Sequence, residues 1–377
     1  MSSNSQNQPQ SSQKTQIITT IGPASLNKQT LEFFAKNNVS IARLNCSHNT
    51  PESHYLAGTM ARNAGLEILM DLQGPKIRLG EVTQVLEVKN GEAITLEQAK
   101  ANQDYPYKNG EKIIFPYEFP AHKFLQIGHR ILIDDGKIEV LVTEVLETSV
   151  NCDVIYGGEI KSRKGMNMPD TDLQVDFLQP RDITFLNDLI PRLQPDYVAA
   201  SFVKTVDDMN KMKNIVNQIL KEHNITDYTP KYCAKIEMGE AVLDKNLSEI
   251  TDASDLIMIA RGDLALETTP AHISVPFLQE KIKNVCLSHK KPFVVATQVL
   301  ESMITSPVPT RAEMSDLYRA IKIDKADYVM LSGESAVGMY PKNCIQLMSD
   351  MINTVAEQSN PKTQSNVTIS INQEQIA

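Results

Sequence analysis

The sequence predicts an α/β protein, a (β/α)8 barrel of the TIM type with a smaller β domain inserted into it. Two observations support this prediction. Short, almost continuously apolar runs recur along the chain, and a pattern typical of a helix follows each of them. Parallel strands need such runs because helices cover both faces of their sheet. Eight strand-helix units are what a closed (β/α) barrel requires.

The predicted barrel strands are spaced along most of the chain. The helical pattern is clearest at residues 206–222, where apolar residues recur three and four apart behind Thr205 and Asp208, a capping-box pair. Most strand starts follow one another at the spacing of one βα unit. The strands are expected at "QIITT" from 16, "SIARLN" from 40, "EILMDL" from 67, "DYVAAS" from 196, "KYCAKI" from 231, "DLIMIA" from 255, "PFVVAT" from 292 and "DYVMLS" from 327.

The connection after the third strand is much longer than one helix needs. Its residues alternate in polarity, and "NGE" from 90 and "DDGK" from 134 are hairpin signals. We therefore predict an inserted small β-barrel lid domain at 80–165, with the catalytic barrel formed by 15–79 and 166–358.

Composition limits the class of protein. With 377 residues, 41% of them hydrophobic, the chain can bury a large core, and its net charge of -9 argues against nucleic-acid or membrane binding. Five cysteines without a CxxC pair predict neither a disulfide framework nor a zinc site, and they fit the cytoplasm. No apolar run reaches membrane-spanning length. Residues 1–14 are predicted to be a disordered tail and 359–377 a polar C-terminal tail.

The carboxyl ends of the predicted strands are rich in polar residues. Barrel enzymes carry their chemistry at these ends, so the residues there are the first candidates for a site. They are Arg43, Asn45, Ser47, Asp71, Ser201, Lys204, Lys235, Glu237, Arg261, Asp263, Thr297, Ser332 and Glu334.

Two neighbouring strand ends suggest a metal and phosphoryl site. Lys235 and Glu237 are two residues apart in "AKIEMGEA" and so point to the same side of a strand, and Asp263 ends the next strand. Two carboxylates can bind a hard divalent cation, and a lysine can neutralise a phosphoryl group in transfer. A single acid at a strand end is more often part of a structural ion pair, but the cluster favours the metal site.

Other strand ends offer groups for anions. Gly262 lets backbone N–H groups approach an anion, although a tight turn would also need glycine there. Thr297 could orient a substrate or simply cap a helix. The basic turn "KSRKG" in the insertion could cover phosphates, although most such runs are merely solvated. "ARLNCSH" gathers Arg43, Asn45, Ser47 and His48, a mixture suited to phosphate contacts, although His48 alone is more often a satisfied polar residue.

Taken together, the motifs resemble those of the pyruvate kinase family. The match runs from about Thr15 to Gln358 through "TIGPAS", "ARLNCSH", "DLQGPKIRLG", "RKGMNMP", "ASFVK", "KIE", "ARGDLALE", "ATQVLESM", "PTRAE" and "MLSGESAVG". The resemblance implies a barrel with a lid after its third strand. It also implies phosphoryl transfer from phosphoenolpyruvate to ADP, giving pyruvate and ATP.

The resemblance also implies roles for individual residues. Glu237 and Asp263 would hold Mg²⁺ or Mn²⁺, and Lys235 would stabilise the phosphoryl group. The pyruvate carboxylate would bind to the backbone amides of Gly262 and Asp263 and to the Thr297 hydroxyl. Further contacts would come from Arg43 to phosphate, from Asn45, His48, Arg78 and Lys164 to the nucleotide, and from Ser332 with Glu334 in protonating the enolate.

"MDLQGPKIRLG" differs from the pattern of family members that need K⁺. Asn45, Ser47 and Asp71 match residues that hold K⁺ in the family, but Leu72 and Lys76 stand at two other positions of that pattern. An ammonium supplies the same single positive charge as K⁺. We therefore expect Lys76, hydrogen-bonded to Asp71, to replace the cation, so that K⁺ is not required.

Other departures concern regulation and assembly. The family usually continues into a C-terminal effector domain, which we do not expect here, so we predict no sugar-phosphate activation through it and a homodimer through the barrel. Met238, Ala265, Met314 and Arg319 depart from the family motifs, and the helix "SDLYRAIKIDKAD" carries one extra residue. Two alternatives are a weakened paralogue that binds or regulates, and another barrel enzyme of phosphoenolpyruvate or pyruvate, such as an aldolase or mutase.

Overall fold

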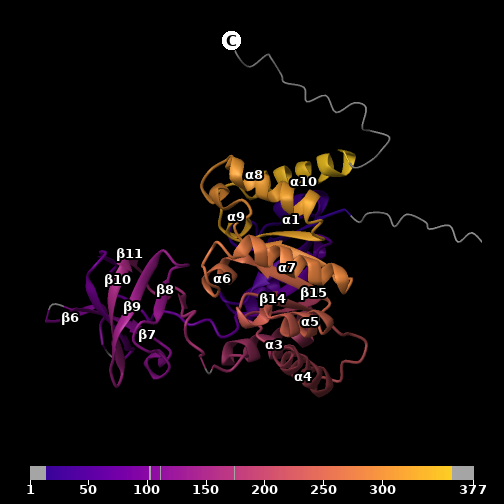
Figure 1. The fold of residues 1–377 in the computed structure, drawn as a ribbon. Coiled ribbons are helices and arrows are strands. Elements are labelled where there is room, and N and C mark those ends of the chain that lie inside the picture. The colour runs from indigo at the N-terminus through magenta and orange to yellow at the C-terminus, as the bar shows by residue number, and fades with distance from the viewer. Residues whose placement is uncertain (1–13, 102, 111, 174, 359–377) are drawn as a thin grey trace, which may run out of the picture. The chain divides into compact units, whose positions relative to one another are not determined.

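Eight strands form a closed barrel in the computed structural model, which describes residues 14–101, 103–110, 112–173 and 175–358 (Figure 1). Their order is β1-β17-β16-β15-β14-β13-β3-β2, and neighbours such as β13 and β14 run parallel. Each strand begins within one residue of its predicted start, so the barrel prediction is confirmed. The bounds are β1 Gln16–Thr20, β2 Val39–Asn45, β3 Glu67–Asp71, β13 Tyr197–Ala200, β14 Lys231–Ile236, β15 Leu256–Ala260, β16 Phe293–Ala296 and β17 Tyr328–Leu331.

Contacts divide the chain into two compact units, which we describe separately. The first unit comprises Met1–Arg43, Thr59–Ile68 and Pro292–Ala377. Within it, the long helix α10 packs against α1 and β1 and buries an apolar face that includes Ile345 and Met348. The helices of this unit are α1 Lys28–Lys36, α8 Arg311–Tyr318, α9 Gly333–Ala336 and α10 Pro341–Gln358.

A π-helix, Arg319–Ile323, follows α8 directly. The backbone N–H of Asp324 donates to the carbonyl of Arg319, five residues earlier, at 2.9 Å. A turn closed in this way holds one residue more than a turn of α-helix. This helix therefore contains one widened turn, while its extra residue relative to the family stays a prediction.

The second unit comprises Leu44–Gly58 and Leu69–Lys291. Its helices pack in succession, α3 on α4, α4 on α5 and α5 on α7 (Figure 1). Helix α4 has the predicted bounds and the predicted capping box of Thr205 and Asp208. The helices are α3 Pro180–Leu193, α4 Val206–Glu222, α5 Asp244–Asp252, α6 Arg261–Leu266 and α7 Val275–Ser288, while α2 Pro51–Asn63 crosses the division.

The strands between β3 and β13 form two sheets of their own within the second unit, drawn in purple in Figure 1. Seven strands pair in the order β12-β8-β9-β10-β5-β7-β6 around an apolar core that includes Phe115 and Tyr117, and β4 pairs with β11. The bounds are β4 Leu86–Val88, β5 Ala93–Gln98, β6 Tyr107–Asn109, β7 Lys112–Tyr117, β8 Arg130–Ile133, β9 Ile138–Val145, β10 Ser149–Tyr156, β11 Gly158–Ile160 and β12 Met166–Asn167.

Two details of the predicted insertion are corrected. "DDGK" does join a hairpin, β8 to β9, but "NGE" lies between β4 and β5, which belong to different sheets. The described strands also pair as an open sheet with β12 and β6 at its edges, and not as a closed barrel. These edge strands have only two and three residues, which leaves little backbone to pair across a closure.

Other sequence predictions concern the cysteines, the membrane and the tails. All five cysteines are free and buried. No helix among the described residues is long and apolar enough to cross a membrane. The predicted tails lie outside the described residues, apart from Lys14. The domain boundaries at 79/80 and 165/166 stay predictions.

Candidate active site

Lys235 lies at the centre of a buried polar cluster in the second unit. It stands near the end of β14 and is only 8% exposed. Its ammonium lies 3.0 Å from Glu237 Oε1 and 3.3 Å from Asp71 Oδ1, and it donates to Ser201 Oγ at 2.6 Å. The ends of β3, β13 and β14 thus bring a cation, two carboxylates and a hydroxyl together, as the strand spacing predicts for these residues.

Asp263 lies in the first turn of α6, directly after β15. Its carboxylate accepts hydrogen bonds from Lys76 Nζ at 2.9 and 3.2 Å and from Asn167 Nδ2 at 3.3 Å. Asn167 also donates to Glu267 Oε1 at 2.6 Å. The partners of Asp263 are therefore side chains from the segment after β3 and from β12.

Glu237 is held by backbone as well as by Lys235. Its Oε2 accepts the N–H of Phe202 at 2.7 Å. Phe202 has a φ of 57°, in the left-handed region that non-glycine residues seldom adopt. Backbone strain of this kind clusters at functional sites. Here it accompanies an amide that is directed at a predicted metal ligand.

The two carboxylates differ in proton affinity. Burial raises the pKa of Glu237, and the charge of Asp263 adds to this rise against the lowering effect of Lys235. Burial also acts to raise the pKa of Asp263, but Lys76, Lys235 and the Asn167 amide outweigh it and hold this pKa below its usual range. The cluster thus keeps Asp263 ionised, whereas Glu237 needs a neighbouring positive charge to stay ionised.

The donor set fits Mg²⁺ or Mn²⁺. Glu237 and Asp263 interact electrostatically, and each is paired with an ammonium that a divalent cation could replace. Hard cations of this size commonly bind one or two carboxylates and complete their shell with water and substrate oxygens. The described residues contain no group of three or more His, Cys, Asp or Glu side chains suited to a metal. Glu237 and Asp263 are therefore the two protein carboxylates available to bind such a cation.

The predicted phosphate-side residues follow β2 and β3. The N–H of Cys46 donates to the carbonyl of Asp71 at 2.9 Å, which brings the two strand ends together. Asn45 Oδ1 accepts the N–H of Ser47 at 3.2 Å, and the carbonyl of His48 contacts His54 Nε2 at 3.0 Å. His48 therefore takes part in the local turn through its backbone, and the role of its side chain stays a prediction.

The predicted partner of Lys76 is wrong. Its ammonium binds Asp263 and lies 5.8 Å from the centroid of the Phe202 ring, whereas Asp71 is paired with Lys235. The anchor is thus a carboxylate far along the chain. A neighbouring ammonium already neutralises Asp71, which removes the electrostatic reason for Lys76 to bind it.

The other predicted nucleotide residues, Arg78 and Lys164, lie where the segment after β3 meets the end of the insertion. Arg78 pairs with Gly165 in an isolated bridge, and its Nη1 donates to the carbonyl of Arg163 at 3.1 Å. The Lys164 ammonium lies 2.7 Å from Asp134 Oδ1. Both cations are thus within the second unit, with partners from the insertion.

Four predicted residues belong to the first unit. Arg43 Nη1 donates to Thr20 Oγ1 at 2.8 Å. Thr297 has a φ of 67°, a clear outlier for a β-branched residue. Glu334 is fully buried and accepts the N–H groups of Leu300 at 3.1 Å and Ser332 at 2.8 Å. The backbone of Ser332 is thus bonded to Glu334, and both Glu334 oxygens accept backbone N–H groups; their role in protonating the enolate stays a prediction.

A family model places these observations in context. The model "Pyruvate kinase, barrel domain" matches residues 12–345. This chain belongs to the pyruvate kinase family. The chain is 37% identical over 347 residues to the pyruvate kinase of Chlamydia muridarum, which covers 90% of this chain and 68% of that relative. It is 35% identical over 354 residues to the pyruvate kinase of Thermococcus litoralis, which covers 92% of this chain and 70% of that relative.

Other pyruvate kinases agree. The chain is 34% identical to the Staphylococcus haemolyticus pyruvate kinase but spans only 56% of its length. The crystal structure of a pyruvate kinase from Cryptosporidium parvum superposes with a TM-score of 0.81 at 33% identity, covering 93% of this chain and 70% of that one. The predicted phosphotransferase of the pyruvate kinase type is confirmed at the level of the family.

Sequence reasoning missed residues that connect the cluster. Asn167 bonds two acids, Glu267 lies beside Asp263, and Phe202 donates to Glu237. Burial, Asp263 and Glu240 raise the pKa of Glu267 to about 7, against the hydrogen bond from Asn167. These residues lie within "KGMNMP", "LALE" and "ASFVK", so the motifs marked the segments although nothing local marked the side chains.

The departures from the family motifs lie in different surroundings. Met238 lines a cavity beside Glu267, and Ala265 is buried within α6. Met314 lies at an open groove of the first unit with Met351. Arg319 begins the π-helix, with its Nε 3.6 Å from Asp324.

Proposed function

We propose that this chain transfers the phosphoryl group of phosphoenolpyruvate to ADP, giving pyruvate and ATP. The observation that supports this most directly is the buried Lys235 ammonium, which stands between Glu237 and Asp71 at 3.0 and 3.3 Å. The bond from phosphorus to the enol oxygen breaks, and a bond from phosphorus to a terminal oxygen of ADP forms. The enolate then takes a proton at carbon.

The side chains divide this work. Phosphoryl transfer needs positioning and charge neutralisation more than covalent chemistry. Lys235 neutralises the phosphoryl oxygens, and Glu237 and Asp263 hold the divalent cation, which supplies charge to the substrate oxygens when bound. Amides at Gly262 and Asp263 with Thr297 hold the carboxylate.

The remaining assigned residues take part in proton transfer, in phosphate contact or in nucleotide contact. Ser332 belongs to the proton route, and Glu334 positions it by accepting its backbone N–H. Because both oxygens of Glu334 are engaged by backbone N–H groups, we assign it a positioning role. Arg43 contacts phosphate, and Asn45, His48, Arg78 and Lys164 face the nucleotide.

The proposal includes activity without K⁺. An ammonium on a flexible stem is available at Lys76, and release from Asp263 on metal binding would free it to serve where a monovalent cation is needed. Asn45 and Ser47 are the oxygen-bearing residues that we propose for that position, whereas Asp71 is already paired with Lys235. Lys76→Glu is then expected to create K⁺ dependence or to abolish activity, and Lys108→Glu on an exposed strand is the control.

Steady-state kinetics test both claims. Pyruvate formation from phosphoenolpyruvate is measured with and without ADP, in K⁺ and in a K⁺-free buffer, with Mg²⁺ or Mn²⁺ present. We expect ADP-dependent turnover at nearly the same rate in both buffers. Pyruvate formation without ADP would point to a different reaction, and inactivity without K⁺ would contradict the role of Lys76.

Assembly and location complete the proposal. The chain is expected to form a homodimer through the barrel and to act in the cytoplasm. Sedimentation velocity tests the dimer, and a stable tetramer would contradict it.

A further inference from the structure

Three side chains of the second unit form a chain of hydrogen bonds away from the metal-ligand cluster. His289 caps the carboxyl end of α7, and its imidazole lies between the carboxylate of Asp252 and the hydroxyl of Ser248. Its Nδ1 lies 2.6 Å from Asp252 Oδ1, and its Nε2 lies 3.2 Å from Ser248 Oγ. Serine, histidine and aspartate are joined in this order, through these ring nitrogens, in the triads of serine hydrolases.

The partners of His289 determine which ring nitrogen carries the proton. An ionised carboxylate can only accept hydrogen bonds, so Nδ1 carries the proton that is shared with Asp252. In the neutral ring Nε2 is then an acceptor, and the hydroxyl of Ser248 donates to it. The imidazole is thus placed to take the hydroxyl proton as a general base. A base in this position converts a weak serine nucleophile into an active one.

The Ser248 hydroxyl is directed at the imidazole and not at its own helix. Two other hydroxyls at this end of α5 bond back to carbonyls four residues earlier, Thr251 to Leu247 at 2.6 Å and Ser254 to Ile250 at 2.7 Å. Such bonds are common for serine and threonine within helices. Among the described residues, the imidazole is the only hydrogen-bond partner of Ser248 Oγ. The oxygen therefore keeps a lone pair for an incoming carbon.

The three side chains can be reached from solvent. Ser248 is half-buried, and the side chains of His289 and Asp252 are 23% and 68% exposed. An open groove between the start of α5 and α7 includes Phe277 and Val285 in its lining, and it extends to within one helical turn of the imidazole. The carbonyl of Val285 accepts the backbone N–H of His289 at 3.0 Å. An acyl group of a few carbons thus has an apolar surface beside the hydroxyl.

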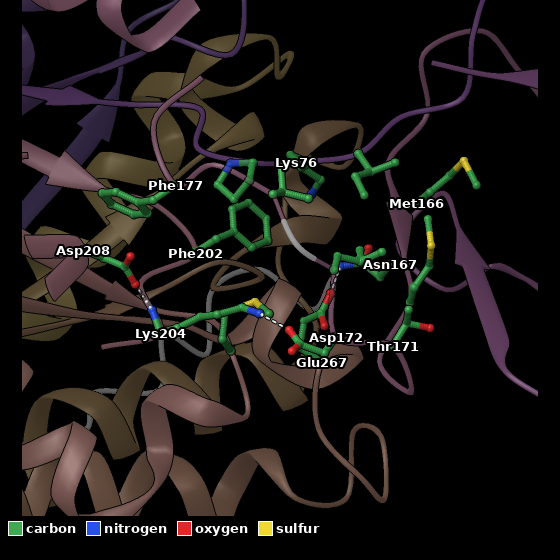
Figure 2. A pocket seen from close by; sticks show the side chains of 16 residues that line it. Lys76, Met166, Asn167, Thr171, Asp172, Phe177, Phe202, Lys204, Asp208 and Glu267 are labelled. Atoms are coloured by element: carbon green, nitrogen blue, oxygen red, sulfur yellow. Dashed lines mark hydrogen bonds and ion pairs between the residues drawn. The ribbon is translucent and has the colours of Figure 1, made fainter. Parts of the chain in front are cut away.

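This cluster is separate from the cavity at the predicted metal ligands. Lys76, Asn167 and Glu267 line that cavity (Figure 2), and two of them bind Asp263, directly after β15. Asp252 instead ends α5, four residues before β15 begins. The five residues of this strand span roughly 16 Å. The two groups of side chains therefore lie at opposite ends of β15, and neither depends on the other for its partners.

We propose that Ser248, His289 and Asp252 form a second catalytic site, which takes the acyl group of a small activated ester and transfers it to water. Ser248 Oγ bonds to the carbonyl carbon while its proton moves to His289 Nε2. The bond from this carbon to the leaving oxygen then breaks, and His289 returns the proton to the leaving group. Water adds to the acylated serine in the same way and releases the acid. Asp252 is a positioning residue, because it acts through the imidazole.

The ester p-nitrophenyl acetate tests the site on the full chain in metal-free buffer. Its leaving group is stable as an anion, so the main demand on the protein is to activate the nucleophile. We expect a burst of nitrophenolate and an acetyl group on Ser248, located by peptide mass spectrometry. Ser248→Ala should lose the burst, whereas Ser288→Ala, whose hydroxyl bonds to the Val285 carbonyl, should keep it. An unacetylated Ser248, or a burst that survives Ser248→Ala, would overturn the proposal.

Two histidines that cap helix ends test the base. His289→Gln is expected to slow the acetylation of Ser248 at least about 10²-fold, the lower end of general-base catalysis. His223→Gln, at the carboxyl end of α4, should leave the rate unchanged. An equal rate in His289→Gln and the parent chain would show that the three side chains only join α5 to α7. Should His289→Gln fail to fold by circular dichroism, the serine pair still decides the question.

Asp252→Asn tests the positioning role. An amide can donate to Nδ1 and so favour the wrong tautomer, which should slow acetylation while Ser248 stays the acetylated residue. A change in thermal stability without a change in acetylation rate would limit Asp252 to a structural contact and contradict its role. None of these readouts involves phosphoryl transfer, so the inference and the proposed function can fail independently.

Discussion

Two aspartates of the second unit, the buried Asp182 and the partly buried Asp263, are held in opposite ways. Asp182 accepts the backbone N–H groups of Gln73 at 2.8 Å, Gly74 at 3.2 Å and Gln179 at 3.0 Å. Among the described residues, the carboxylate of Asp263 accepts hydrogen bonds from two side chains, Lys76 and Asn167. A backbone amide cannot turn away without moving the chain, whereas a side chain can. The comparison separates a structural carboxylate from one that is free to exchange partners.

The electrostatics follow the same division. Burial raises the pKa of Asp182 despite its three amide partners, while the ammonium groups beside Asp263 hold its pKa below the usual range. A carboxylate already matched with positive charge can accept a metal in place of an ammonium. Fixed amides at Asp182 instead fasten the turn after β3 to the start of α3.

The largest effect is expected from Lys235→Met. Removing one preorganised charge from a transferring group typically costs about 10²- to 10³-fold in kcat. Coupled pyruvate assays measure this loss, and circular dichroism checks that the variant folds. Lys245→Met, on the surface of α5, is the matched control. A Lys235→Met enzyme with ordinary kcat would remove Lys235 from the chemistry.

Asp263→Asn should weaken Mn²⁺ binding by at least about tenfold, since even second-shell partners contribute that much. Its effect on thermal stability should be small, because Lys76 is partly exposed and can turn toward water. Calorimetric Mn²⁺ titration and thermal melts report the two quantities. Unchanged Mn²⁺ affinity would mean that Asp263 is not a ligand.

Asp182→Asn should show the reverse result. An amide in place of the carboxylate leaves backbone N–H groups short of acceptors, at a cost of about 1–3 kcal/mol in the free energy of unfolding. Urea denaturation measures the loss, and the Mn²⁺ affinity of the folded variant should stay as in the parent chain. Lost Mn²⁺ binding with full stability would contradict the comparison between the two aspartates.

The smallest expected effect is a pH dependence at Glu267. Its folded pKa of about 7 lies above the ordinary value of 4.5, so the folded chain holds this proton more tightly than the unfolded chain. The contribution is complete below about pH 4.5 and disappears as pH rises to about 7. After allowance for partial exposure we expect about 1 kcal/mol.

Metal-free urea denaturation of the parent chain and Glu267→Gln checks this dependence. The difference in unfolding free energy between them should grow in favour of Glu267→Gln as pH rises from 5 to 8. A difference that is the same at every pH would show that Glu267 titrates normally. Glu280→Gln, on α7, serves as the control.

Sequence patterns predicted the barrel and its polar strand ends because both follow from local rules. Apolar runs mark buried parallel strands, and residue spacing along β14 places Lys235 and Glu237 on one side. These rules say nothing about partners far apart in the chain. Lys76 was expected to bind Asp71, five residues away, but it binds Asp263, 187 positions along the chain.

The hairpin error has a similar origin. "NGE" makes a turn, with Gly91 at a φ of 82°, but β5 then pairs with β7 and β10 instead of the strand before it. Turn residues set the local path of the chain, while the partner of a strand depends on the whole sheet. The cavity beside Asn167 escaped prediction for the same reason, because its walls come from five separate segments.

The widened turn at Arg319–Ile323 marks a place where the chain can change its length at little structural cost. An extra residue in a strand would shift every later side chain to the opposite face, whereas one in a helix can be confined to a single turn. Deleting one residue there should return the bonding to the ordinary α pattern and leave β17 and the Ser332 to Glu334 hydrogen bond where they are. This helix can thus be shortened by one residue without a change of register in the strand that follows it.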